Sequence, residues 1–346
     1  MPWPSIDVTA ITVFAWFDWL TNPASRTFWG FWLSSAALAV AWALLDWPRR
    51  SAYVRQWLSK DYWLHPSARQ DYWLIALNTL LFTMLGISSL LWIIEVANLS
   101  YRGLNQLWPE AANSGLNALP TPVLVMLYSL VLLLADDASR YALHRTLHSR
   151  WLWPIHRLHH SANVLTPLTF LRLHPLEQGL YQLRGILVHG SLSGGYFFIT
   201  SSAPQLWLIV GVSGVVWLFN LLGANLRHSN IPLHYGWFEH ILISPAQHQM
   251  HHGIGGSRVN YGSMLAIWDR CFGSWRSGQT QLDAPLPLPQ QQVALSRQLL
   301  LIRPAATQQH RRSALIANIA VAANTTVVAN TPSEHTTSEH AATETS

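Results

Sequence analysis

Cysteine and charge are both scarce in this sequence. Cys271 is the only cysteine among 346 residues, which rules out a disulfide within the chain and any cysteine-rich zinc or iron–sulfur site. Charged residues make up 11% of the chain, against roughly 25% in an ordinary soluble domain. The formal net charge of +5 forms no basic stripe and accompanies no RNA-binding motif, so a nucleic-acid partner is not expected.

Apolar and aromatic residues take the place of charge. Half of the residues are hydrophobic, and 19 are tryptophan, which favours the membrane–water interface. A membrane-spanning helix needs about 20 mostly apolar residues. Five apolar runs approach this length, although the third and fourth are short enough to be partial or tilted spans or buried helices: 27–45, 74–94, 122–135, 185–200 and 205–224. The pattern predicts an all-α integral membrane bundle of about four transmembrane helices, with the last two runs forming a hairpin.

Basic residues predict the orientation of this bundle. Arginines and a lysine crowd the segment between the first two runs, and five more arginines follow the third run, whereas residues 95–121 contain only Arg102. Positively charged loops favour the cytoplasm, so residues 136–184 and those from 225 onward should form a cytoplasmic helical cap. We therefore divide the chain into an N-terminal membrane region (1–120), a catalytic region (121–276) and a polar, largely disordered tail (277–346).

Eight of the 17 histidines fall in three short boxes within the predicted cap. The first box reads HRTLH, the second HRLHH and the third HQMHH; their histidines are His144 and His148, then His156, His159 and His160, then His248, His251 and His252. Spacings of three and four bring side chains to one face of a helix, so each box should direct its imidazoles at one spot. Eight imidazoles suit two metal ions, with positions left for oxygen.

Chance does not account for these boxes. With 17 histidines in 346 positions, about 0.04 copies of HxxHH are expected when windows are counted along the chain. Two copies are present, and an HxxxH box ends eight residues before one of them. Neighbouring buried histidines are costly unless something uses their lone pairs, so an ordinary structural role for all eight is not expected.

The boxes and their flanks resemble the membrane fatty acid hydroxylase and sterol desaturase superfamily, whose pattern is HxxxH or HxxxxH followed by two HxxHH boxes. The resemblance extends over residues 128–275. Matching flanks are Asp137, Leu152–Trp153 before the second box, Asn163 after it, RLHPLE at 172–177, RHSNIP at 227–232, Pro245, NYG at 260–262 and WDRCFGSW at 268–275.

This resemblance implies a non-haem centre of two iron ions that uses O₂ to oxidise a lipid C–H bond. Relatives of this type often use one or two further histidines between the second and third boxes. His228, in RHSN, is the best candidate for an additional ligand and His174, in RLHP, is the next; His234 and His240 are weaker candidates. Hydroxylation, desaturation and oxidative cleavage share one ligand set, so the reaction and the substrate (fatty acyl, sterol, carotenoid or ether lipid) stay open.

The chemistry of imidazole leaves the metal itself open. Imidazole suits iron, zinc and copper, so the boxes specify a two-metal site more firmly than they specify iron. Carboxylates commonly accept the second ring N–H of a liganding histidine, and Asp137, Glu177 and Asp269 are candidates for this outer role. An oxygenase also needs electrons, and because the sequence contains neither a dinucleotide fingerprint nor a fused cytochrome motif, we expect a separate ferredoxin, cytochrome or reductase.

Two other classes of protein have a histidine-rich pattern. A membrane hydrolase with a histidine-bound zinc pair would activate water and would act without O₂ or reductant. A bis-histidine haem or metal-transport protein would place its histidines within the spans, on opposed helices, whereas these lie beyond the spans in tight boxes.

Overall fold

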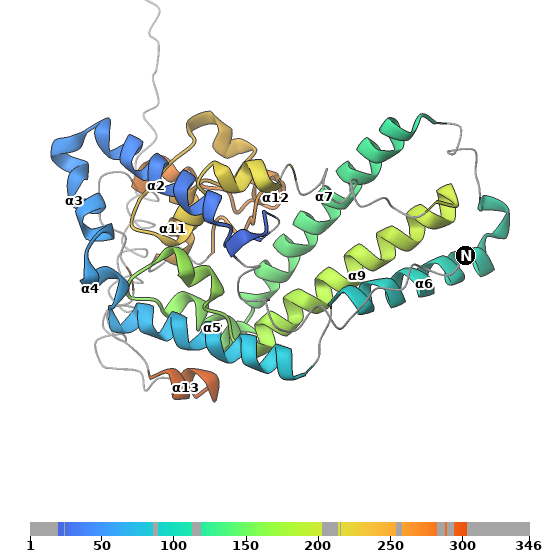
Figure 1. Ribbon diagram of the computed structural model, residues 1–346, viewed down its shortest axis with the longest axis horizontal. Coiled ribbons are helices and arrows are strands. Elements are labelled where there is room, and N and C mark those ends of the chain that lie inside the picture. Colours follow the sequence, from blue (N-terminus) through green and yellow to red (C-terminus); the bar gives the residue numbers. More distant parts are fainter. Residues whose placement is uncertain are drawn as a thin grey trace, which may run out of the picture. The chain divides into compact units, whose positions relative to one another are not determined.

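The computed structural model describes residues 20–23, 25–85, 89–112, 119–202, 214, 216–253, 258–281, 288 and 294–302. These residues form helices and turns without a β-strand; one isolated bridge joins Leu242 and Leu265. The chain divides into two units, Met1–Leu301 and Ile302–Ser346, and nearly all of the described residues belong to the first. The predicted all-α class is therefore confirmed for the described chain (Figure 1).

The helices follow one another in chain order with short connections. The α-helices are α2 (Trp29–Leu44), α3 (Trp47–Trp57), α4 (Lys60–Trp63), α5 (Pro66–Met84), α6 (Ser89–Leu107), α7 (Thr121–Leu147), α8 (Trp153–His156), α9 (Pro175–Thr200), α11 (Pro245–His252), α12 (Ile267–Cys271) and α13 (Leu295–Leu299). Short 3₁₀ helices are η2 (Pro109–Ala111), η4 (His159–Ser161), η5 (Pro167–Leu171), η6 (Ala224–His228), η7 (Gly236–His240) and η8 (Gly278–Gln281).

Helices α6, α7 and α9 lie side by side (Figure 1). Gly190 and Gly194 on α9 allow the close approach of α6, since a Cβ on Gly190 would lie 2.6 Å from the Cβ of Val96 and one on Gly194 would meet the carbonyl of Ala97. Small residues of this kind are typical of helix contacts in membranes. On the other side, Tyr128 of α7 packs against Tyr196 of α9.

Helix α7 is the one described helix that is long and apolar enough by itself to cross a bilayer. Only 22% of its most apolar 18-residue stretch is buried, and Met126, Leu127, Leu130 and Val131 are exposed. An exposed apolar face of this length is unfavourable in water and suits contact with lipid.

The predicted apolar runs agree only in part with these helices. The run 122–135 was predicted to end at Asp136 and Asp137, but α7 extends to Leu147, with His144 in its last turn and His148 at its C-cap, because Arg140 and Arg184 pair with Asp136 and backbone N–H groups bind Asp137. The run 74–94 is divided between α5 and α6, which are inclined at 54° and qualify as a span only together. The run 27–45 forms a helix of 16 residues, and most of the run 205–224, with its hairpin, lies outside the described residues.

The N-terminal helices support the segments that carry histidines. Ala39, Trp42 and Ala43 of α2 form a buried cluster with Leu226 of η6 and Ile231. At the start of α5, Asp71 forms a fully buried ion pair with Arg172 (N–O distance 3.1 Å). Breaking one partner of such a pair is strongly destabilising because it leaves a buried charge without compensation. The region before residue 120 therefore helps to hold the loops between the boxes.

Candidate metal centre

Nine histidines from four parts of the chain converge in the structure. Local sequence explains how each is presented: Pro122 lies in the first turn of α7, whose last turn carries the first box, and Ser244 and Gln247 form a reciprocal capping box at the start of α11, which carries the third. The second box spans α8 and η4, and His228 ends η6. All nine are buried except His148, which is half-buried.

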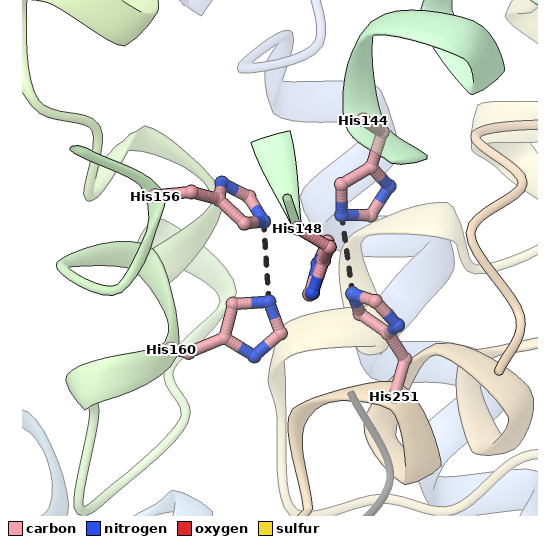
Figure 2. Close-up of side chains that lie close together, drawn as sticks. All are labelled: His144, His148, His156, His160 and His251. Atoms are coloured by element: carbon pink, nitrogen blue, oxygen red, sulfur yellow. Dashed lines mark hydrogen bonds between the residues drawn. The ribbon is translucent and has the colours of Figure 1, made fainter. Parts of the chain in front are cut away.

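The nine imidazoles form two groups. The five-histidine group contains His144, His148, His156, His160 and His251, and the four-histidine group contains His159, His228, His248 and His252. Within each group the nitrogen atoms that could bind a metal lie within 4.8 Å of one another. Figure 2 shows the five-histidine group, with the rings facing one another and His148 between the others.

Each HxxHH box is divided between the two groups, contrary to the expectation that a box serves one spot. His156 and His160 belong to the five-histidine group and His159 to the other, whereas His248 and His252 join the four-histidine group and His251 the other. Helical residues are about 100° apart, so residues i and i+4 point nearly together while the adjacent histidines i+3 and i+4 diverge. One HxxHH box can therefore supply two neighbouring sites.

Hydrogen bonds at Nδ1 orient several rings. The Nδ1 atoms of His144 and His251 each lie 2.7 Å from a backbone carbonyl, those of Tyr261 and Val259 respectively. His156 Nδ1 lies 2.7 Å from the Glu177 carboxylate. Because a carbonyl oxygen can only accept, Nδ1 of His144 and His251 carries the proton, and Nε2 of each neutral ring keeps its lone pair.

The distance between two of these Nε2 atoms indicates whether the group suits a metal ion. His144 Nε2 and His251 Nε2 lie 3.1 Å apart, a distance at which two acceptors repel each other unless a cation lies beside both. Ligands about 2.1 Å from a metal and at right angles are about 3 Å apart. The five-histidine group therefore fits a metal ion on the chemistry of its donors.

Unpaired nitrogens show the same fit in the four-histidine group. In the described part of the chain, Nδ1 of His228 and His248 and both ring nitrogens of His252 are buried without a hydrogen-bond partner. Nε2 of His228 lies 3.0 Å from Nε2 of His248 and 3.3 Å from that of His159. A buried nitrogen without a partner is costly. A metal ion bound among the facing Nε2 atoms would use a lone pair of His252 as well, whereas Nδ1 of His228 and His248 would stay without a partner because each ring binds through one nitrogen.

Burial keeps these imidazoles neutral. Desolvation, followed by repulsion from neighbouring histidines, holds the pKa of His160, His228, His248, His251 and His252 well below the ordinary value of 6.5. The same effects lower the pKa of His148 to about 2 and that of His159 to about 3. At neutral pH the rings therefore present lone pairs, as a metal ligand must.

The structure does not bring His174 into either group. Its Nδ1 accepts the backbone N–H of Leu176 at the start of α9, and its Nε2 lies 3.2 Å from the carbonyl of Leu299. His174 caps α9 and lies outside both groups, so the structure does not support the prediction of an additional ligand there. His234 and His240 also lie outside both groups; His240 stacks on Trp275, with ring centres 4.5 Å apart.

The three predicted outer carboxylates differ in what they contact. Glu177 binds His156 directly, as described above. Asp137 instead accepts from the backbone of Met264 and Leu265 and from Trp268. Asp269 accepts from the backbone N–H groups of Tyr261 and Gly262, so it acts on His144 only by holding the carbonyl of Tyr261. The prediction of direct contact with a histidine is therefore wrong for Asp137 and Asp269.

Two features of the site carry no signal in the sequence. The carbonyls of Val259 and Tyr261 bind histidines through backbone atoms that any residue possesses. Arg26 reaches the carbonyl of Ala224 and the side chain of Asn225 from about 200 positions away, and lines a 360 Å³ cavity beside both groups. The NYG motif, which contains Tyr261, marks this segment as part of the family pattern but does not indicate the role of its carbonyl.

Comparison with known proteins points to one family. The family model described as fatty acid hydroxylase matches residues 129–274. The chain is 29% identical over 170 residues to a Delta(7)-sterol 5(6)-desaturase of Aspergillus fumigatus, covering 45% of this chain and 50% of that protein. It is 31% identical over 145 residues to the alkylglycerol monooxygenase of Danio rerio, covering 41% of this chain and 29% of that protein.

A very-long-chain aldehyde decarbonylase of Oryza sativa is 27% identical over 146 residues, covering 41% of this chain and 22% of that protein. The chain thus spans half or less of the length of these relatives, and no solved structure matches it. The matched segment contains all three boxes and His228. Through this segment the chain carries a fatty acid hydroxylase domain and is similar to members of the fatty acid hydroxylase and sterol desaturase superfamily.

Proposed function

We propose that this protein is a membrane oxidoreductase that uses two non-haem iron ions and O₂ to hydroxylate or desaturate a lipid C–H bond, in the synthesis or modification of lipids or sterols. The observation that carries the proposal is the pair of buried groups of five and four neutral imidazoles. The relatives named as a sterol desaturase and an alkylglycerol monooxygenase support oxidation of a lipid.

The nine histidines of the two groups are the proposed iron ligands. Iron held there would supply the oxidising power for cleavage of a C–H bond with O₂. The chain's own contribution is orientation: the carbonyls of Tyr261 and Val259 and the carboxylate of Glu177 hold Nδ1–H of His144, His251 and His156, so that Nε2 of each faces its group. Partners of this kind also make an imidazole a better electron donor.

The protein is proposed to be multi-pass, with its histidines on the cytoplasmic side. The apolar face of α7 and the arginine-rich segments on either side of the boxes support this arrangement, since positive loops favour the cytoplasm. Both histidines of the first box lie at the C-terminal end of α7, where a lipid held in the membrane would approach them. Residues 121–276 are the proposed catalytic region.

A cavity beside the groups is the proposed substrate site. It has a volume of 360 Å³ and is lined by His144 and His156 of the five-histidine group and by His159, His228 and His248 of the other. Phe170, Leu171 and Leu173 give it an apolar wall. Ligand sites commonly have volumes of about 300–1,000 Å³, so part of a lipid can lie next to both groups.

Electrons are proposed to come from a separate ferredoxin, cytochrome or reductase. His148, the half-buried member of the five-histidine group, lines a second cavity of 450 Å³ together with Arg145 and Arg258. This is a side of the five-histidine group from which a soluble donor can approach without crossing the substrate cavity.

Isotope labelling of cells that express the protein tests the proposal. Wild type, His251→Ala and the control His240→Ala are expressed to equal levels, and their lipids are compared by mass spectrometry under ¹⁸O₂. We expect a lipid that gains one ¹⁸O atom, or loses two hydrogens, in wild type and His240→Ala but not in His251→Ala. A wild-type product that forms equally without O₂ would instead indicate the zinc hydrolase.

A further inference from the structure

Three arginines line the cavity that borders both histidine groups: Arg26, Arg140 and Arg227. Arg26 comes from the segment before α2, Arg140 from α7 and Arg227 from η6. A cavity that takes only a hydrocarbon chain has no need of guanidinium groups, because burying a charge without a partner is costly.

Two of these arginines lie close together, and neither has a carboxylate partner in the part of the chain that the structure describes. Arg26 donates from a terminal nitrogen to the carbonyl of Ala224 (2.9 Å), and Arg227 donates from Nε to the same carbonyl (3.1 Å). Their donor atoms are therefore no more than about 6 Å apart, the sum of two hydrogen-bond lengths. The other partners of these arginines are neutral: the side chain of Asn225 for Arg26 and the carbonyl of Ser263 for Arg227.

The carboxylates near the cavity are engaged elsewhere. Asp136 pairs with Arg140 and Arg184, and Glu177, which lines the cavity, holds His156. Among the described residues, no ion pair involves Arg26 or Arg227. Any metal ion in the adjoining groups would add further positive charge.

We propose that Arg26 and Arg227 bind an oxyanion on the substrate, so that the protein takes a lipid with a carboxylate or phosphate headgroup. Guanidinium groups bind both oxyanions through paired, charge-assisted hydrogen bonds. The ring of Phe170 lies 4.2 Å from the Arg26 guanidinium carbon and begins the apolar wall along which the first carbons of the lipid would lie. The carbons nearest the headgroup then lie nearest the histidines. The inference rests on the proposed function for the identity of the cavity's occupant.

Equilibrium binding of three probes with one chain length tests the inference: hexadecanoate, hexadecyl phosphate and hexadecanol. The full-length, iron-loaded protein is held in phosphatidylcholine nanodiscs. We expect both anions to bind wild type at least about tenfold more tightly than the alcohol, as expected for charge-assisted bonds. Equal affinities for the three probes would overturn the proposal without any variant.

Arg26→Gln should remove most of this preference while leaving the affinity for hexadecanol nearly unchanged. The matched control is Arg49→Gln, because Arg49 has a side chain that is 87% exposed and lies outside the cavity; it should keep the preference. If Arg26 only tethers Asn225, Arg26→Gln will lower the melting temperature and keep the preference, which would overturn the proposal. Arg26→Lys, which keeps the charge, should retain part of it.

Inorganic phosphate distinguishes the lipid headgroup from a free anion. Millimolar phosphate should weaken hexadecanoate binding and leave hexadecanol binding unchanged. Tight phosphate binding without any preference among the lipids would show a site for a free anion and overturn the lipid assignment. Anion preference in a protein that oxidises no lipid would contradict the proposed function alone, whereas O₂-dependent oxidation without anion preference would contradict this inference alone.

Discussion

In the five-histidine group three rings are held through Nδ1 by groups outside it, whereas in the four-histidine group only His159 has such a partner, the carbonyl of Arg172 at 3.3 Å. His228, His248 and His252 have buried Nδ1 atoms without a partner among the described residues. A ring held from behind keeps its orientation before metal arrives, and this preorganisation raises affinity. The comparison therefore predicts that the five-histidine group binds its metal more tightly.

The largest expected effect comes from removing a ligand of the five-histidine group. His251→Ala should lower turnover on the order of 100-fold or more, beyond the 10–100-fold that loss of an outer partner costs. It removes both a fully buried imidazole and the close partner of His144. Turnover of the lipid product and iron content per chain measure the effect; activity near that of wild type at full iron loading would remove His251 from the site.

His228→Ala should empty the four-histidine group and leave the five-histidine group occupied. Because His228 lies between His159 and His248, its loss should remove activity and lower the iron content from about two to about one per chain, with the five-histidine group still occupied. His240→Ala is the matched control, since His240 lies outside both groups; it should keep activity and iron content, and its effect should be limited to the stability that stacking on Trp275 contributes. Equal activity and iron content in the two variants would exclude His228.

Glu177→Gln should have a smaller effect. It measures how much the carboxylate that contacts His156 contributes to iron affinity and turnover. The amide oxygen can still accept from His156 Nδ1 but lacks the charge, so we expect iron affinity or turnover to fall by about tenfold. His228 has no comparable partner to lose, so this sensitivity should be confined to the five-histidine group. Competition with a chelator measures the affinity, and a change of less than about twofold would show that orientation through Glu177 is unimportant.

Acidification should change the stability of the iron-free protein rather than its turnover. Both groups contain histidines whose pKa in the folded state lies far below 6.5, so on acidification the unfolded chain takes up protons first. Stability should therefore fall as the pH drops below about 6.5, by up to about 1.4 kcal/mol per buried ring for each pH unit. Melting temperatures between pH 7.5 and 5.5 measure this, and a protein that gained stability on acidification would contradict neutral rings.

The sequence predicts which histidines cluster, but it does not predict how they divide into two groups. Spacing identified eight histidines, and the RHSN resemblance added His228, because histidine is rare enough for its clustering to be informative. The division of each HxxHH box between two groups depends on side-chain direction. The position of His174 outside both groups could not be predicted, because a helix cap and a metal ligand look alike in sequence. Of the three predicted outer carboxylates, Glu177 contacts a histidine of the five-histidine group, whereas Asp137 and Asp269 bind backbone N–H groups.

The limits of the apolar helices were harder to predict than the clustering of the histidines. Hydropathy located α7 but ended it at Asp136, because the pairing of Asp136 with Arg140 and Arg184 cannot be seen in a run of apolar residues. The contacts that Arg26 and Asp71 make with the segments around the histidine groups join residues about 100 to 200 positions apart. Such long-range packing has no local signal.

X-ray absorption at the iron edge of anaerobically purified, iron-loaded protein tests most directly whether the nine histidines hold two iron ions. We expect about two iron ions per chain, each surrounded mainly by imidazole nitrogens at about 2.0–2.2 Å, the range of metal–histidine bonds. In His228→Ala the signal should decline to about one iron that keeps its imidazole neighbours. Iron bound mainly by oxygen, or a wild-type protein that holds no more than one iron when fully loaded, would contradict this expectation.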